Sequence, residues 1–459
     1  MKDFDIVFDH KSSIPLYRQL YDYLLKEIYD GNLKENEKLP SRRALCNQLK
    51  INKNTVESAY QKLAAEGYIM SEPRSGFYVR NRYGNIDEKE GENLPDYIYN
   101  FSINAIDILK IPYEIWQKLY RDTIMDNPSL FSHGENFGER ILQKAIEKYL
   151  HNFRGVNCNF NQIIIGAGIE YLLMMLSIVM EKNTVYGVEN PCHRRINSAV
   201  NLCDKKIYYL DVTKNGFPME ELKNSNVNIV FVMPSHQYPV GYSMSIEQRR
   251  ELLEWANARK NRYIVEFHTD SEFVYDKPIS SIQSLNNNEK VIYIGDFAKT
   301  IGPSIKTAFI VLPKTLLKKW KTKLSTYYAP VNLFEQWVLA EFIQEGYFNK
   351  HVKQMKQIYM KKRDLLISEL KKTKFWDKME VYDNLNGTHF IAKFNTDVPE
   401  KQMEITARQE GVKIIPMTRH FFRKSGLYND KYFIFGFGGL ENFEIIEAVK
   451  LLEKAWGTL

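Results

Sequence analysis

One lysine of the sequence stands where amine chemistry is feasible. Lys299 lies in VIYIGDFAKTIGPSIKTAFIVLP (residues 291–313), after an apolar run typical of a strand and before a Gly-Pro turn. A lysine amine at such a place can form a Schiff base with the aldehyde of a cofactor. The alternative is a surface lysine that merely follows a strand. The residues around Lys299 therefore decide which interpretation holds.

Two other segments offer groups for ligand binding. Gly166, Ala167 and Gly168 precede the helical run EYLLMML, so their N–H groups could face an anion at a helix start, although a plain turn is the alternative. His193, in VENPCHRR, could stack on a ring or could be a core histidine. No metal-ligand spacing, Walker loop or Ser-His-Asp order is evident, and the four cysteines form no CxxC pair, so we expect no metal site.

A second kind of chemistry is indicated near the N-terminus, where cations gather. Residues 34–80 contain nine Lys or Arg against five Glu, and the whole chain has a net charge of +7. This excess permits a polyanion partner such as DNA, with an ordinary solvated surface as the alternative.

The elements that would position these cations follow from apolar spacing. Leu16, Leu20, Leu24 and Ile28 recur every four residues and predict a first helix. Pro40 and Ser41 begin a second helix, with Ser41 as the N-cap. A third helix carries an apolar face of Val56, Ala59, Tyr60 and Leu63, and the following YIMSEPRSGFYV predicts a hairpin with its tip near Gly76. Together these elements make a winged helix-turn-helix.

LPSRRAL, INKNTV, LAAEGYI and RSGFYV in this region resemble successive signatures of GntR-type winged-helix repressors. The resemblance implies that Arg43 and Lys53 contact phosphate or a base edge and that Asn54 and Thr55 open the recognition helix in the major groove. Lys53 stands where arginine is commoner, which predicts weaker base specificity. The residues expected to bind DNA are Arg42, Arg43, Lys53, Asn54, Thr55, Arg74 and Gly76.

The organisation of the chain is predicted as three parts. Residues 12–80 form the winged helix, and residues 81–96, acidic and without apolar periodicity, form a linker. From residue 97 to 459, short β runs alternate with helical stretches, which indicates a mostly parallel α/β sheet, and residues 345–459 form a smaller α+β lobe. No apolar stretch is long enough to cross a bilayer, so a cytoplasmic protein is expected.

Several stretches of the larger part resemble the MocR/GabR family of transcriptional regulators, which join a GntR-like head to a type I aminotransferase-like domain. They are HGENFGERILQKAIEKYLHNFRGV, MPSHQYPVGYSMSIEQRRELLEWA, TDSEF, the run around Lys299, and NGTHF. The resemblance implies a fold type I, PLP-dependent transferase-like α/β domain with a small α+β lobe, and a head-to-tail homodimer. It also implies pyridoxal phosphate (PLP) as cofactor and a small amine or amino acid as effector.

Against that family pattern, Lys299 keeps the position of the Schiff base, and His236 matches a loop beside the cofactor. Phe267 replaces the carboxylate that pairs with the pyridine nitrogen, and Thr269 replaces a tyrosine. Other substitutions affect the ring and phosphate positions: His193 for tyrosine, Asp296 for threonine, Ala298 for serine and Lys306 for arginine. The substrate-carboxylate arginine aligns with Ile434, with Arg419 and Arg423 as substitutes.

The sequence thus predicts a DNA-binding regulator whose aminotransferase-like domain dimerises and senses a small ligand through closure or head placement. Two alternatives stay open. One is a PLP-dependent aminotransferase with an accessory head, and the other is a regulator whose domain works without PLP. No residue is assigned a catalytic role, because the partners that turnover needs are replaced.

Overall fold

The computed structural model describes residues 4, 6, 8, 9, 15–29, 32–34, 36–65, 68–72, 75–79, 97–102, 105–213, 216–268, 270–275, 280–285, 289–383, 385–425 and 430–457. The chain divides into two compact units, Met1–Pro95 and Asp96–Leu459. The predicted linker, residues 81–96, lies outside the described residues.

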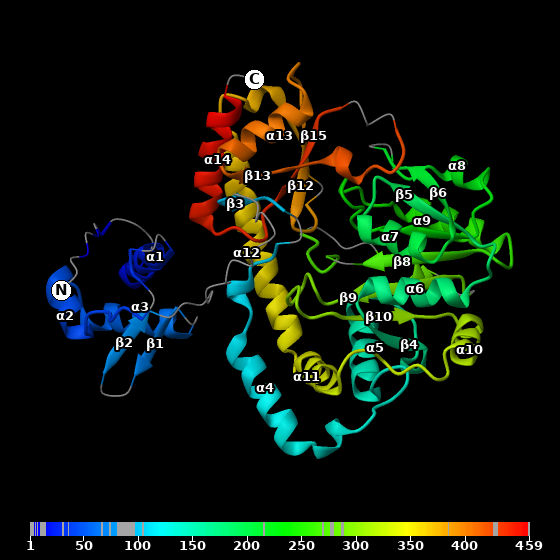
Figure 1. Ribbon diagram of the computed structural model, residues 1–459, viewed down its shortest axis with the longest axis horizontal. Coiled ribbons are helices and arrows are strands. Elements are labelled where there is room, and N and C mark those ends of the chain that lie inside the picture. Colours follow the sequence, from blue (N-terminus) through cyan, green and yellow to red (C-terminus); the bar gives the residue numbers. More distant parts are fainter. Residues whose placement is uncertain are drawn as a thin grey trace. The chain divides into compact units, whose positions relative to one another are not determined.

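The first unit is a winged helix, as predicted (Figure 1). Its elements are α1 (Leu16–Tyr29), α2 (Arg42–Leu49), α3 (Lys53–Ala65), β1 (Ile69–Glu72) and β2 (Gly76–Val79). Strands β1 and β2 pair antiparallel from Ile69 opposite Val79 to Glu72 opposite Gly76, which makes the wing. Ser41 caps α2 as expected, since its hydroxyl accepts a hydrogen bond from the backbone N–H of Ala44 at 3.1 Å.

The core of this unit leaves the start of α3 in solvent. Leu20 and Leu24 of α1, Leu45 of α2 and the apolar side of α3 are fully buried, and α1 and α2 both pack against α3. Because α3 turns Val56 and Tyr60 inward, its first residues face outward. The expected recognition helix therefore buries one side in the core and exposes its N-terminal end to solvent.

The second unit is organised around a seven-stranded sheet of order β4-β10-β9-β8-β7-β5-β6. The strands are β4 (Ile163–Ala167), β5 (Val185–Asn190), β6 (Lys206–Asp211), β7 (Ile229–Val232), β8 (Tyr263–His268), β9 (Val291–Asp296) and β10 (Thr307–Val311). Five neighbouring strands, β9 to β6, are parallel, and β10 runs antiparallel to both β9 and β4. The predicted mostly parallel sheet is confirmed.

Helices cover both faces of this sheet, because its strands are apolar on both sides. Along β9, Ile292 and Ile294 pack with α6 and α10, whereas Val291 and Tyr293 join the cores on the opposite face. The helices of the large part are α4 (Tyr113–Asp126), α5 (Arg140–Arg154), α6 (Ile169–Val179), α7 (Arg194–Leu202), α8 (Met219–Lys223), α9 (Ile246–Asn257), α10 (Lys314–Lys323) and α11 (Leu333–Gln344).

A smaller lobe follows the long helix α12 (Tyr347–Leu370), drawn in yellow in Figure 1. Its antiparallel sheet has the order β11-β12-β15-β14, and β13 pairs parallel with β3. The remaining elements are β3 (Tyr99–Asn100), β11 (Met379–Tyr382), β12 (His389–Phe394), α13 (Glu400–Gln409), β13 (Val412–Lys413), β14 (Ile415–Pro416), β15 (Tyr432–Gly436) and α14 (Asn442–Trp456). This lobe has a core of its own, which includes Phe390, Phe433 and Trp456.

No helix among the described residues has both the length and the apolar character needed to cross a membrane.

Candidate ligand pocket and nucleic-acid surface

Lys299 is an interior lysine with an ionic partner. It lies in the turn after β9, and its Nζ is 3.5 Å from Oδ2 of Asp270, with side chains that are 12% and 4% exposed. The ring centroid of Tyr238 lies 5.9 Å from the same nitrogen. Removing one partner of a buried ion pair leaves the other uncompensated, so each of these two charges depends on the other.

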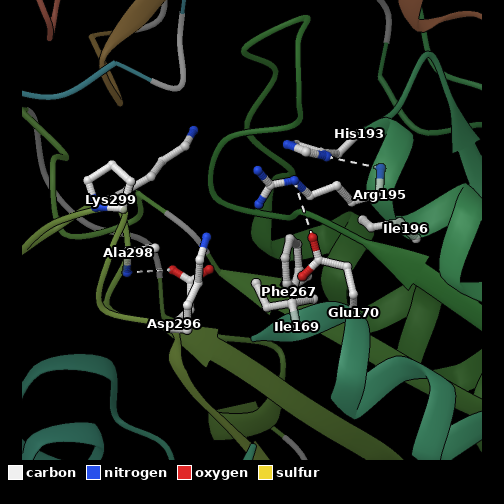
Figure 2. A pocket seen from close by; sticks show the side chains of 11 residues that line it. Ile169, Glu170, His193, Arg195, Ile196, Phe267, Asp296, Ala298 and Lys299 are labelled. Atoms are coloured by element: carbon white, nitrogen blue, oxygen red, sulfur yellow. Dashed lines mark hydrogen bonds and ion pairs between the residues drawn. The ribbon is translucent and has the colours of Figure 1, made fainter. Parts of the chain in front are cut away.

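Beside Lys299 is a cavity of about 80 Å³ at the carboxyl ends of β8 and β9 (Figure 2). Its lining residues are Ile169, Glu170, His193, Arg195, Ile196, Phe267, Asp296, Ala298, Lys299, Pro303 and Lys306. The fold thus brings together three of the candidates from the sequence, Lys299, His193 and Lys306. Gly166, Ala167, Gly168 and His236 are described but do not line this cavity.

Two carboxylates face this cavity. Asp296 ends β9 and accepts a hydrogen bond at 3.3 Å from the N–H of Ala298, while Glu170, in the first turn of α6, pairs with Nε of Arg195 at 3.2 Å. Burial raises the pKa of Asp296 to about 7, although the charge of Lys299 opposes this rise. Figure 2 shows the ring of Phe267 between these two acids in this view.

The apolar and aromatic part of the wall comes from Phe267 and His193. Phe267, in β8, is 4% exposed and belongs to the main core. His193 caps α7: its Nδ1 accepts a hydrogen bond from the N–H of Arg195 at 3.3 Å, and its ring lies 5.0 Å from that of Tyr238. Burial and the charge of Lys299 lower the pKa of His193 to about 3, so its imidazole is neutral.

The Gly-Ala-Gly segment, which ends β4 and precedes α6, has a packing role. A Cβ on Gly166 would lie 2.6 Å from Cδ2 of Leu172, and Gly168, the N-cap of α6, has a φ of +86°. Lack of space therefore favours glycine at residue 166, and the left-handed backbone favours it at residue 168. Glu170 stands beside this helix start, since a Cβ on Gly168 would lie 3.3 Å from its Oε2.

Next to the cavity, two histidines and Lys299 lie close to Asp270. Nδ1 of His236 is 3.3 Å from Oδ2 of Asp270, and the rings of His236 and His389 are 4.7 Å apart. All three residues are buried, and one side-chain N or O atom from each lies within 4.8 Å of the others. The sequence pattern singled out His236 but not Asp270 or His389, because the three belong to segments far apart in the chain.

A chain of polar contacts joins the last residue of α5 to two residues of β8. Nη2 of Arg154 is 2.8 Å from Nδ1 of His268, and Nε2 of His268 is 3.0 Å from Oε1 of Glu266. Burial, together with the charge of Arg154, lowers the pKa of His268 to about 4. A neutral His268 thus accepts from Arg154 and donates to Glu266. Thr269, which follows, lies outside the described residues.

The two arginines considered for a ligand carboxylate have partners elsewhere. Nε of Arg423 is 3.1 Å from Oδ1 of Asp211, and Arg419 pairs with Glu404. Ile434 is fully buried in β15. None of the three lines the cavity.

The candidate nucleic-acid surface of the first unit surrounds the start of α3. Lys53 and Asn54 are exposed, Thr55 is half-buried, and Arg43 is exposed on α2. Arg42 pairs with Glu57 of α3, and its guanidinium lies 5.7 Å from the ring centroid of Phe77 in the wing. Gly76 opens β2 with a φ of +122°, and Arg74 lies outside the described residues.

One unit is a winged helix. The other is an α/β sheet covered by helices on both faces, with a small lobe and a lysine beside a pocket. This combination defines a class of two-domain regulators. Comparison with known proteins agrees. Residues 16–79 match the model of bacterial regulatory proteins of the gntR family, and residues 97–421 match that of aminotransferase class I and II.

The chain belongs to the family of HTH-type transcriptional regulators that carry an aminotransferase class I and II domain. It is 34% identical to the HTH-type transcriptional regulator YdeL of Bacillus subtilis, over 96% of this chain and 97% of that protein. It is 28% identical to the probable rhizopine catabolism regulatory protein MocR of Rhizobium meliloti, over 98% and 96%. Among solved structures, kynurenine aminotransferase of Pyrococcus horikoshii, in complex with PMP, resembles it with a TM-score of 0.69 at 21% identity, over 78% and 90% of the two chains.

Proposed function

We propose that this protein binds operator DNA through the start of α3 and regulates transcription in response to a small molecule bound by its second unit. The observation that carries the proposal is the exposed end of α3, where Lys53 and Asn54 face solvent in a unit that matches the gntR family. A recognition helix contacts base edges with its N-terminal residues, and nearby cations such as Arg43 neutralise phosphates.

The aminotransferase-like unit is proposed to join two chains head to tail and to sense the effector. A homodimer presents two heads to paired half-sites, so that the spacing of the half-sites reflects the symmetry of the protein. An effector that binds one arrangement of the lobes better than another shifts DNA affinity by that difference in binding free energy.

We propose that this pocket fits PLP poorly, although Lys299, Arg195 and Lys306 line it. This cofactor carries a phosphate dianion and a pyridine nitrogen that, once protonated, needs a carboxylate. The start of α6, where an anion would be favoured, has Glu170 in its first turn, and Asp296 faces the same cavity. Phe267 supplies a hydrocarbon ring where a carboxylate is needed. We therefore propose that the domain works as a ligand-sensing module without transamination.

The competing function is a PLP-dependent aminotransferase with an accessory head. One observation favours it: Lys299 is an interior lysine at the end of a strand, beside a cavity. Its amine is already paired with Asp270, and that pairing also suits a lysine with a purely structural function.

The DNA proposal is tested by selecting bound fragments from random duplex DNA with the full-length chain. The expected result is enrichment of a sequence with two related half-sites, protected together in a footprint. Retention of DNA without any enriched sequence would contradict operator recognition.

The two cofactor proposals are separated by a spectrum of the full-length protein after incubation with excess PLP. A protonated Schiff base between PLP and Lys299 would absorb at about 420 nm, and Lys299→Ala would abolish the band. We expect no such band from the wild type. A stable band that requires Lys299 would reject the proposal of a PLP-independent module and would leave the DNA result unaffected.

A further inference from the structure

The buried cluster of His236, Asp270 and His389 has the composition of a metal site. It combines two imidazoles with one carboxylate, and one side-chain N or O atom from each lies within 4.8 Å of the other two. His236 follows β7, Asp270 follows β8, and His389 begins β12 of the small lobe. Imidazole and carboxylate groups together are ligands for Zn²⁺ and similar divalent transition ions.

The orientation of His389 gives a second, independent observation. Its Nε2 lies 3.1 Å from the carbonyl oxygen of Pro239, so this nitrogen donates and the other, Nδ1, carries the lone pair. Nδ1 is buried and has no hydrogen-bond partner among the described residues. Metal-binding histidines have this arrangement, in which one nitrogen binds the ion and the other donates to a carbonyl group.

The surrounding backbone holds the cluster in place. Gly387 has a φ of +70°, and a Cβ there would lie 2.2 Å from Cε1 of His236 and 2.8 Å from Oδ2 of Asp270. The turn before β12 therefore packs directly against both side chains. Asn386, in the same turn, has a buried Oδ1 without a partner in the described structure, although its Nδ2 donates to Ser243 at 3.0 Å.

We propose that His236, Asp270 and His389 bind one divalent transition-metal ion of the Zn²⁺ type. Ligand atoms about 2.1 Å from a tetrahedral ion lie about 3.4 Å apart. Nδ1 of His236 and Oδ2 of Asp270 already have this separation, at 3.3 Å, and no pair of ligand atoms needs to close by more than about 1.4 Å. Three protein ligands leave a fourth position for water or an effector group. The ion joins the loops after β7 and β8 to the small lobe, and this inference does not depend on DNA binding.

Lys299 is the competitor for this site. Its ammonium lies 3.5 Å from the same Oδ2 of Asp270 that His236 approaches, so metal and ammonium compete for one carboxylate. Metal binding must turn the lysine away or remove its proton. Metal affinity at this site should therefore depend on Lys299, whereas accidental binding by surface histidines should not.

The experiment titrates full-length, chelator-treated protein with Zn²⁺ by calorimetry and with Co²⁺ by visible absorption. The expected result is one ion per chain, with Co²⁺ bands of a low-coordinate N/O site. His389→Gln and Asp270→Asn should each weaken binding at least about tenfold, as expected for the loss of a ligand. Lys299→Met should tighten it about tenfold or more by removing the competing charge.

The matched control is His420→Gln. His420 is also buried, has an unpartnered Nδ1, and contacts Tyr238 through Nε2 at 3.1 Å, yet it is not part of the cluster. Its variant should bind as the wild type does. Thermal melting of each metal-free variant identifies any that fail to fold, and His236→Gln then replaces such a variant.

The proposal is overturned if the wild type binds no Zn²⁺ or Co²⁺. It is equally overturned if folded ligand variants bind as tightly as the wild type, or if Lys299→Met leaves the affinity unchanged.

Discussion

The ammonium of Lys299 and the carboxylate of Asp270 form a buried ion pair, 3.5 Å apart, at the carboxyl end of the central sheet. The pair gives the lysine a structural function that needs no cofactor. It also connects the cavity, which Lys299 lines, to His236, which contacts Asp270, and to the neighbouring His389.

The first prediction concerns this pair. Asp270→Asn should lower the free energy of unfolding by about 3 kcal/mol, because it leaves a buried ammonium without its counter-ion. Lys299→Met and the double variant should show that the two losses are not additive, with a coupling of about 1 kcal/mol or more in a denaturant-based double-mutant cycle. Additive losses would show that the pair contributes no interaction free energy.

The second prediction concerns Gly387. Replacement by alanine should lower stability by about 2 kcal/mol or more, since the new methyl group overlaps His236 and the backbone is left-handed. Gly346→Ala is the matched control: its φ is +78°, but nothing lies within 4 Å of a Cβ there. That variant should lose only about 1 kcal/mol from backbone strain. Thermal melts that gave equal losses would rule out the proposed overlap.

The third prediction concerns the head. Arg43→Ala and Lys53→Ala should each weaken operator binding and reduce the slope of log K against log salt concentration by about 1, as for lost phosphate contacts. Lys26→Ala, an exposed cation in the last turn of α1, serves as control and should change neither quantity. Unchanged slopes for Arg43→Ala and Lys53→Ala would remove these residues from the interface.

The fourth prediction follows from the raised pKa of Asp296, about 7 in the folded chain. Between pH 4 and 7 the folded state holds a proton that the unfolded state, with its lower pKa, has lost, so ionisation destabilises the protein as pH rises. Asp296→Asn should be more stable than the wild type by roughly 4 kcal/mol at pH 8 and about equal to it near pH 4. Thermal unfolding across this range measures the difference, and a constant difference would place the titration elsewhere.

The fifth prediction concerns the cofactor. A variant with Phe267→Asp, Asp296→Thr and Ala298→Ser supplies a carboxylate and two hydroxyls in place of a hydrocarbon ring and an acid, so it should gain PLP binding. Absorption near about 420 nm and its loss on adding Lys299→Ala measure the gain. An unchanged spectrum in a folded variant would show that these three residues do not exclude PLP.

Features encoded within short segments were predictable from the sequence. Ser41 at a helix start and the apolar faces of α1 and α3 follow from local spacing, and the structure confirms the winged helix they compose. The alternation of apolar runs and helical stretches was sufficient to predict a mostly parallel sheet. The antiparallel direction of β10 was not predictable, because strand direction depends on the path of the connection and not on the residues of the strand.

Contacts between distant segments could not be predicted in the same way. Arg42 was expected to bind DNA, and that stays a prediction; its ion pair with Glu57 of α3, which joins two helices, could not be predicted from local spacing. Asp270 and His389 carry no local motif that joins them to His236, so only the fold shows that the three meet. Asp296 was noted in the sequence as a departure from the family pattern. That Glu170 lines the same cavity depends on how α6 packs beside β9.

The hydrogen bond from His389 to the carbonyl group of Pro239 crosses the seam between the small lobe and the large sheet domain. His389 is the first residue of β12, so its ring moves with the small lobe as one body. Moving that lobe away from the large domain by about 3 Å would take the imidazole out of hydrogen-bond reach of Pro239. The exchange rate of this one imidazole proton should therefore report how often the lobes part.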